Sequence, residues 1–211
     1  MAPPVTLYFL QASRSIRIAW LLEELNIPYN IEFADLENFH APKAFKAKSG
    51  TYLGRSPTLK DGDLTIIESG AITEYLLETY DKENRLLPKD TIPRVRIREW
   101  IHASEATFVM HAIAILCTRG TLSPMLGHMT ANLKNDLNWL EEELRKGGGK
   151  FLMGDKITAA DTMMEYGVNL TLKKNVGTDG QRWEKIEGWL KNCHESETYK
   201  KAVQKSGYSL D

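Results

Sequence analysis

The chain has 211 residues, 42% of them hydrophobic, which is enough apolar material for a folded core and excludes a disordered protein. A net charge of −1 excludes a general electrostatic attraction to nucleic acid or to an anionic membrane. The length fits one large domain or two small ones.

The two cysteines, Cys117 and Cys193, stand alone in the sequence, so they provide neither a metal-ligand spacing nor a disulfide framework. We expect both to be reduced core residues. The N-terminal residues MAPPV lack the basic and apolar segments of a signal peptide. No uninterrupted apolar run approaches the roughly 18 residues of a membrane span. These features predict a cytoplasmic protein with no metal, no nucleic-acid partner and no membrane partner.

The first 36 residues carry strand, helix and strand signals in turn. Residues 5–10, VTLYFL, form a short apolar run typical of a buried strand. Residues 13–26 repeat apolar side chains at the spacing of an amphipathic helix, and Pro28 ends that helix. Residues 30–36 alternate apolar and polar side chains, which predicts a second strand.

A hairpin and a helix complete the first 80 residues. Residues 39–48 are polar and carry only a weak helical pattern. Asp61-Gly62 lies between two runs with high strand propensity, which is a strong hairpin signal. Ser69 is a natural N-cap for a helix over residues 70–80. The predicted order is therefore β-α-β, a loop with a weak helix, and then β-β-α.

The rest of the chain predicts helices only. Apolar spacing indicates helices through residues 97–115, 126–144, 158 onward and 183–190, and three glycines at 147–149 end the second of them. Charges and prolines mark a linker just before these helices. We therefore predict an α/β domain at residues 1–82, a linker at 83–93 and an all-helical domain at 94–211.

Three blocks of sequence are more specific than these patterns. They are SRSIRIAWLLEELNIPY (13–29), GRSPTLKDGDLTIIESGAITEYL (54–76) and FLMGDKITAADTMM (151–164). In order and spacing they resemble the cytosolic glutathione transferase family, closest in style to a fungal or bacterial branch. The resemblance implies a thioredoxin-like α/β N-terminal domain and an all-α helical-bundle C-terminal domain. It also implies glutathione as co-substrate, a homodimer and a small hydrophobic electrophile as second substrate.

Conjugation requires the glutathione thiol as its anion, yet a free thiol titrates near pH 8.5. Lowering that pKa by about two units takes roughly 2.7 kcal/mol in favour of the thiolate. A hydroxyl donor and a helix N-terminus can supply this. The resemblance places the catalytic hydroxyl at Ser13 in serine-type transferases and at Tyr8 in tyrosine-type ones. Ser13 is the preferred assignment; an ordinary N-cap serine and a packed strand tyrosine are the alternatives.

The same resemblance assigns the residues that hold the rest of glutathione. Ser56 and Pro57 match a cis-proline that exposes the backbone of the preceding residue to the cysteinyl part. Glu68 and Ser69 match the pair that holds the γ-glutamyl end, where a helix start offers free N–H groups to a carboxylate.

Assignments for the glycyl end and for the second substrate follow the family less closely. Arg55, directly before Ser56, and His40, in the weakly helical stretch with Lys43, are candidates for the glycyl carboxylate. His40 and Lys43 could equally be solvated surface residues. Phe108, His111 and Ile115 are candidates for an apolar pocket that takes the electrophile, and bundle core is the alternative for each.

Thr158 and Asp161 form a variant of the helix capping box, with aspartate in place of glutamate. Its role is structural, and loss of the cap in Asp161→Ala predicts a cost of about 1–2 kcal/mol.

The functional expectation is glutathione transfer to electrophilic small molecules, and reduction of organic hydroperoxides by the same thiolate is a further expectation. Two other readings remain open. The first is a non-catalytic binding or interaction module with the same fold. The second is an isomerase that uses glutathione as cofactor.

Overall fold

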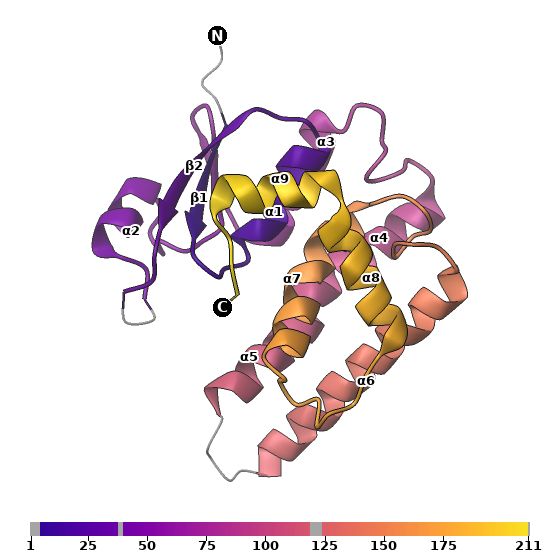
Figure 1. The fold of residues 1–211 in the computed structure, drawn as a ribbon. Helices are drawn as coiled ribbons and strands as arrows, with labels where there is room; N and C mark the ends of the chain where they lie inside the picture. Colours follow the sequence, from indigo (N-terminus) through magenta and orange to yellow (C-terminus); the bar gives the residue numbers. More distant parts are fainter. Residues whose placement is uncertain (1–4, 38–39, 119–123, 211) are drawn as a thin grey trace. The chain divides into compact units, whose positions relative to one another are not determined.

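The computed structural model describes residues 5–37, 40–118 and 124–210. The chain divides into two compact units, Met1–Leu86 with Ser196–Asp211, and Leu87–Glu195. The elements are drawn in Figure 1: β1 Val5–Leu10, α1 Ser15–Glu24, β2 Tyr29–Ala34, α2 Lys43–Ser49, β3 Thr58–Asp61, β4 Leu64–Ile67, α3 Ser69–Tyr80, α4 Thr91–Ala103, a π-helical segment η1 Ser104–Val109, α5 Met110–Cys117, α6 Pro124–Gly147, α7 Ala159–Lys173, α8 Glu184–Glu195 and α9 Glu197–Ser206.

The first unit is built on a four-stranded mixed sheet with the strand order β2-β1-β3-β4. β1 pairs with β2 in parallel and with β3 in an antiparallel manner, and β3 and β4 form an antiparallel hairpin. In that hairpin Asp61 is paired with Leu64, and Gly62 has the positive φ (+59°) that the tight turn needs. The predicted order of elements in this unit is confirmed.

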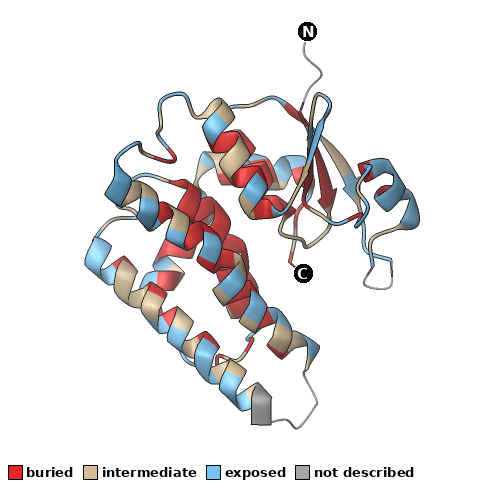
Figure 2. Cartoon of the chain, turned by 180° about the vertical axis from the view of Figure 1, so that it is seen from behind, coloured by how far each residue is buried: buried red, intermediate tan, exposed pale blue. Residues whose placement is uncertain are grey.

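Helix α1 is buried on nearly all sides, although its spacing predicted an amphipathic helix. Every residue from 15 to 22 is buried (Figure 2). The reason is α9, which packs along α1 within this unit. Trp20 stacks edge-on against Tyr199 at 5.1 Å between ring centroids, and its indole N–H donates to Thr198 at 3.1 Å. Thr198 in turn donates to the Glu24 carboxylate.

This packing makes the observed division of the chain differ from the predicted boundaries. Residues 94–211 were expected to form one helical domain, but the residues from Ser196 on belong to the first unit. Tyr208 adds to the attachment, because its ring lies edge-on to Phe9 of β1 at 6.3 Å between centroids. Aromatic contacts made by the end of the chain therefore decide its place.

The second unit is a bundle of α4, η1, α5, α6, α7 and α8. The run from Thr91 to Cys117 is long and apolar enough, by length and composition alone, to cross a membrane. Polar residues interrupt it in the sequence, which is why counting uninterrupted apolar residues does not find it. Its buried side chains pack against α6 and α7, so we interpret it as the core helix of the bundle.

Cys193 and Cys117 have different environments. Cys193 is buried as predicted, and burial raises the pKa of its thiol. Cys117 was expected in the core but is exposed. It is the last residue of α5, whereas the buried side chains of that helix are Ala112 and Ile115.

The predicted capping box at the start of α7 is confirmed. The Asp161 carboxylate is fully buried and accepts a hydrogen bond from the Thr158 N–H at 2.8 Å. It also accepts from the Thr158 hydroxyl at 3.1 Å, the Leu152 N–H at 2.9 Å and the Trp189 indole at 2.9 Å. Burial raises the pKa of Asp161, and these donors act against that rise. The aspartate thus joins α7, α8 and the preceding loop.

Candidate functional site

Ser13 lies in the turn between β1 and α1, two residues before the helix begins. Its hydroxyl oxygen accepts a hydrogen bond from the Ser15 N–H at 3.2 Å. The same hydroxyl donates to the Ser15 hydroxyl oxygen at 3.0 Å. The side chain is partly exposed, so a ligand at the N-terminus of α1 can reach it. Ser13 is therefore held at the positive end of the helix dipole.

Ser15 extends this contact to the segment that precedes β3. Its buried hydroxyl is 2.5 Å from the Ser56 hydroxyl. Ser56 also donates to the Tyr8 carbonyl at 2.8 Å and accepts from the Leu10 N–H at 3.1 Å. Each hydroxyl has one proton, so the protons have one consistent arrangement: Ser13 donates to Ser15, Ser15 to Ser56, and Ser56 to the backbone of β1. The peptide bond between Ser56 and Pro57 is cis, as predicted.

Tyr8 lies in the middle of β1 with 6% of its surface exposed. Its ring is edge-on to Phe45 of α2, with centroids 6.0 Å apart. This packing contact by itself explains why an aromatic side chain occupies position 8. The choice between Ser13 and Tyr8 as thiol donor stays a prediction.

Glu68 and Ser69 form the junction between β4 and α3. Glu68 has φ +73° and ψ +117°, a backbone conformation that costs energy for a residue with a side chain and that is concentrated at functional sites. The helix begins at Ser69, so Glu68, and not Ser69 as predicted, occupies the cap position. Ser69 is buried with 5% of its surface exposed.

Arg17 is a residue of this region to which the sequence patterns gave no definite role. It is buried on α1 with 1% of its surface exposed, and one of its guanidinium nitrogens donates to the Ser69 hydroxyl at 3.4 Å. The sequence does contain one signal for this residue: Arg17 follows Ser13 by four residues, which is about one helical turn. The buried guanidinium and the N-terminus of α3 both place positive charge next to Ser69, which favours an anionic group there.

Arg55 and His40 are both exposed. The backbone carbonyl of Arg55 accepts a hydrogen bond from the Thr58 hydroxyl at 2.6 Å, which fixes the backbone beside Ser56. His40 forms an isolated backbone bridge with Glu37. These contacts position the two backbones and leave binding of the glycyl carboxylate a prediction.

The candidates for the second substrate lie in the helical unit. Phe108 is fully buried in η1 with its ring 6.3 Å from that of Trp139, and Ile115 is buried on α5. His111 is half-buried, and its Nδ1 lies 2.7 Å from the Asp136 carboxylate of α6. Burial raises the pKa of Asp136, and the contact with His111 acts against that rise. Contact of these residues with a substrate stays a prediction.

The π-helical segment that contains Phe108 was not predicted. Such wide turns inside helices occur frequently at functional sites. No sequence period signals one, because a single inserted residue leaves the apolar spacing on either side intact.

Within residues 5–37, 40–118 and 124–210, no cluster of three or more histidine, cysteine or acidic side chains could hold a metal ion. The groups gathered in the first unit are hydroxyls, one buried guanidinium and two helix starts. These groups suit a ligand that carries both a thiol and a carboxylate.

The mixed sheet with its cis proline and the separate helical bundle define a two-part protein with a thioredoxin-like first domain. A family model described as the N-terminal domain of glutathione S-transferase matches residues 3–78, and one described as the C-terminal domain matches residues 125–205. The chain belongs to the glutathione transferase family.

Individual relatives agree with this assignment. Glutathione S-transferase 3 of Schizosaccharomyces pombe is 29% identical over 176 residues, which are 76% of this chain and 71% of the relative. A glutathione S-transferase structure from Actinobacillus pleuropneumoniae is 30% identical with a TM-score of 0.83, covering 98% of this chain and 94% of that one. A glutathione transferase homologue from Lodderomyces elongisporus, solved with two glutathione molecules per subunit, is 21% identical with a TM-score of 0.77 over 96% and 98% of the two chains.

Proposed function

We propose that the protein is an enzyme that binds glutathione in its first unit, stabilises the thiolate and transfers it to electrophilic small molecules. The observation that carries the proposal is the chain of hydroxyls from Ser13 through Ser15 to Ser56. It places a partly exposed hydroxyl at the N-terminus of α1 and ties it to the residue before the cis proline. Membership of the family and the glutathione bound to the related Lodderomyces protein support the same ligand.

To donate a hydrogen bond to the glutathione sulfur, the Ser13 hydroxyl must turn its proton away from its present acceptor. In the structure that proton is donated to Ser15. A neutral hydrogen bond of this kind contributes about 0.5–1.5 kcal/mol, whereas a bond to a charged acceptor contributes about 1.5–3 kcal/mol. Rotation of the hydroxyl toward a thiolate is therefore favourable, and Ser15 still holds the serine through its backbone N–H. The N-terminus of α1 adds to the stabilisation of the anion.

The γ-glutamyl end of glutathione fits the start of α3. Its carboxylate would accept from the Ser69 hydroxyl and from N–H groups of the first turn, with the buried Arg17 adding positive charge. The strained backbone of Glu68 orients the junction for this contact.

Glutathione binding and turnover together test the proposal. We expect retention on immobilised glutathione and conjugation of 1-chloro-2,4-dinitrobenzene. Ser69→Ala should weaken glutathione binding about tenfold, measured by calorimetry, because one hydrogen bond to a carboxylate is lost. The kcat at saturating glutathione should change less than threefold. Retention without turnover of several electrophiles would instead indicate a carrier.

For the second substrate we propose the part of the helical unit around Phe108, His111 and Ile115. Phe108 and Ile115 are buried in the bundle, so the half-buried His111 is the side chain of the three that a substrate would meet first. Reduction of organic hydroperoxides would use the same thiolate. The rate with cumene hydroperoxide, measured beside the conjugation rate, tests this second activity.

We also propose that the protein acts in the cytoplasm as a homodimer. Tyr52 is fully exposed, and its neighbour Leu53 and the hairpin residue Leu64 are exposed as well. Tyrosine is enriched among the residues that contribute most to protein–protein binding, so Tyr52 is our candidate anchor for the dimer interface. Tyr52→Ser should raise the dimer dissociation constant about thirtyfold, which corresponds to about 2 kcal/mol. Sedimentation velocity measures this, and a wild-type monomer at tens of micromolar would contradict it.

A further inference from the structure

The chain passes between its two units twice. The first connection follows Leu86 and the second follows Glu195, so Arg85 and the residues from Ser196 on both belong to the first unit. These two stretches are far apart in the sequence, yet one side chain contacts both of them. That side chain is Glu24, the last residue of α1.

Each oxygen of the Glu24 carboxylate holds one of the two stretches. One oxygen accepts a hydrogen bond from the hydroxyl of Thr198, in the first turn of α9. The other accepts from a guanidinium nitrogen of Arg85 at 2.9 Å, and the same nitrogen donates to the Glu24 backbone carbonyl at 2.6 Å. Only 6% of the Glu24 side chain is exposed. A carboxylate removed from water to this extent depends on its donors, because a buried charge without partners is costly.

Short hydrogen bonds carry the contact at Arg85 to the backbone of the first connection. The Asp81 carboxylate accepts from the Arg85 N–H at 3.0 Å and from the Leu86 N–H at 2.8 Å. Leu86 itself is fully buried. The backbone is therefore fixed directly beside the residue whose side chain reaches Glu24.

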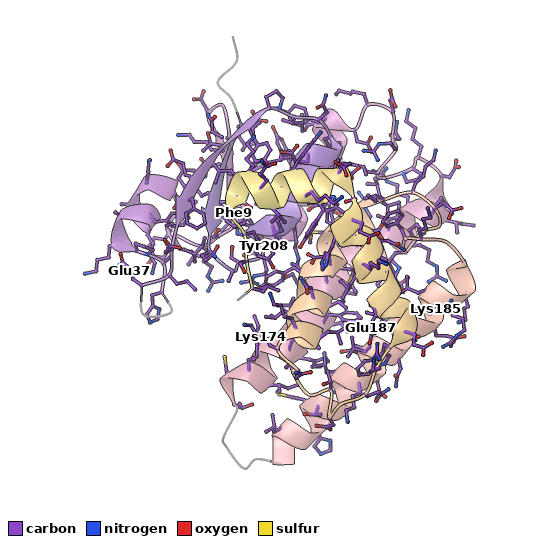
Figure 3. All side chains as sticks on the ribbon, in the orientation of Figure 1. Phe9, Glu37, Lys174, Lys185, Glu187 and Tyr208 are labelled. Carbon is purple, nitrogen blue, oxygen red and sulfur yellow. The ribbon has the colours of Figure 1, made fainter. Side chains whose placement is uncertain are left out.

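The second connection is fixed in a similar way at the start of α9. The Ser196 hydroxyl accepts from the Tyr199 N–H at 3.3 Å, and the Ser196 carbonyl accepts from the Lys200 N–H at 3.1 Å. Beyond the other end of the helix, the ring of Tyr208 packs on Phe9 (Figure 3). Helix α9 is thus held on the first unit along its length, and Thr198 is its contact with Glu24.

We propose that Glu24 is a positioning residue that couples the two connections, so that loosening one of them loosens the other. Removing either donor leaves one oxygen of a nearly buried carboxylate unpaired. Rotation of the side chain toward water relieves that cost and weakens the remaining hydrogen bond. Arg85 and Thr198 therefore depend on each other through Glu24.

The consequence for catalysis rests on the proposed function. The proposed thiolate site belongs to the first unit, and the candidate residues for the electrophile belong to the helical unit. Use of the electrophile therefore depends on how firmly the two units are connected, whereas glutathione binding does not. Glu24 should accordingly affect the KM for the electrophile and leave the affinity for glutathione unchanged.

Amide hydrogen exchange, followed by NMR, tests the coupling in Arg85→Gln. The Leu86 N–H reports on the first connection, and the N–H groups of Tyr199 and Lys200 report on the second. We expect exchange of all three to become about fivefold faster, as for the loss of a partly exposed ion pair. Arg145→Gln is the matched control, because it breaks an exposed arginine–glutamate pair within α6. Its exchange rates at the three amides should stay within twofold of the wild type.

Thr198→Val tests the coupling in the opposite direction, and it should speed exchange of the Leu86 N–H by a similar factor. Amides of β1 exchange through more global unfolding, so they separate coupling from a general loss of stability. In both variants the KM for 1-chloro-2,4-dinitrobenzene should rise about threefold, while the dissociation constant of glutathione stays within twofold.

Faster exchange at both connections, with β1 unchanged and the KM raised, supports the proposal. Faster exchange only at the substituted connection, acceleration that β1 shares, an equal effect of Arg145→Gln, or an unchanged KM overturns it. If glutathione does not bind at all, the proposed function fails, and the exchange rates still decide whether Glu24 couples the two connections.

Discussion

Replacing Ser13 with alanine is expected to lower kcat for conjugation about 10–50-fold at pH 6.5, with less than a threefold change in glutathione affinity. The hydroxyl stabilises charge that exists only once the thiol is ionised. A pKa lowered by about two units leaves about half of the bound thiol ionised at pH 6.5, against about 1% at the ordinary thiol pKa of about 8.5, and the N-terminus of α1 keeps part of that shift in the variant. The contacts proposed to hold the tripeptide, at Ser69 and along the backbone before Pro57, do not involve this hydroxyl. Stopped-flow measurement of the thiolate absorbance in the bound complex, together with steady-state kinetics, checks both parts.

The loss should shrink as the pH rises. Above the ordinary thiol pKa of about 8.5, glutathione ionises without help, so the variant should approach the wild-type rate there. A deficit that stays constant from pH 6 to pH 9 would mean that Ser13 positions the substrate and does not stabilise the anion.

Two neighbouring substitutions separate the alternatives. Tyr8→Phe should retain at least a third of the wild-type rate, because the Tyr8 ring is explained by its packing on Phe45. Ser15→Ala breaks the link between Ser13 and Ser56 and should have an intermediate effect, through the position of Ser13. If Tyr8→Phe abolishes turnover while Ser13→Ala retains it, the assignment of the thiol donor is wrong.

Asp161→Ala is expected to lower the free energy of unfolding by about 4 kcal/mol or more. The cap alone would account for about 1–2 kcal/mol. The structure adds the Leu152 N–H and the Trp189 indole, both buried donors that would lose their acceptor. Each such loss costs about 1–3 kcal/mol, so the network outweighs the cap.

Thermal and urea unfolding measure this effect. For a chain of this length, 4 kcal/mol corresponds to a fall in Tm of roughly 8–16 °C. Ser196→Ala is a matched control, because Ser196 is also a helix cap: its hydroxyl accepts a hydrogen bond from the Tyr199 N–H at the start of α9. That variant should lose only about 1 kcal/mol. Equal losses in the two variants would show that the bonds to Leu152 and Trp189 contribute nothing.

Several features of the protein could be predicted because neighbouring residues determine them. The turn at Asp61-Gly62 needs only a residue pair that tolerates positive φ between two runs with strand propensity, and the strands formed on either side of it. The capping box at Thr158 likewise needs only two side chains three residues apart. The three sequence blocks identified the family, and the family models match the regions that contain them.

Which surfaces meet was decided by the tertiary structure. The pattern of α1 predicted one exposed face, but α9, nearly 180 residues further on, covers that face through Trp20 and Thr198. Other long-range contacts place the buried Arg17 beside Ser69 and connect Ser15 to Ser56, 41 residues apart. Periodicity reports how apolar a helix face is, and it carries no information about the partner that will cover that face. The sequence alone therefore determined the local elements and the family, whereas the hydroxyl chain and the buried arginine beside Ser69 exist only once distant segments pack together.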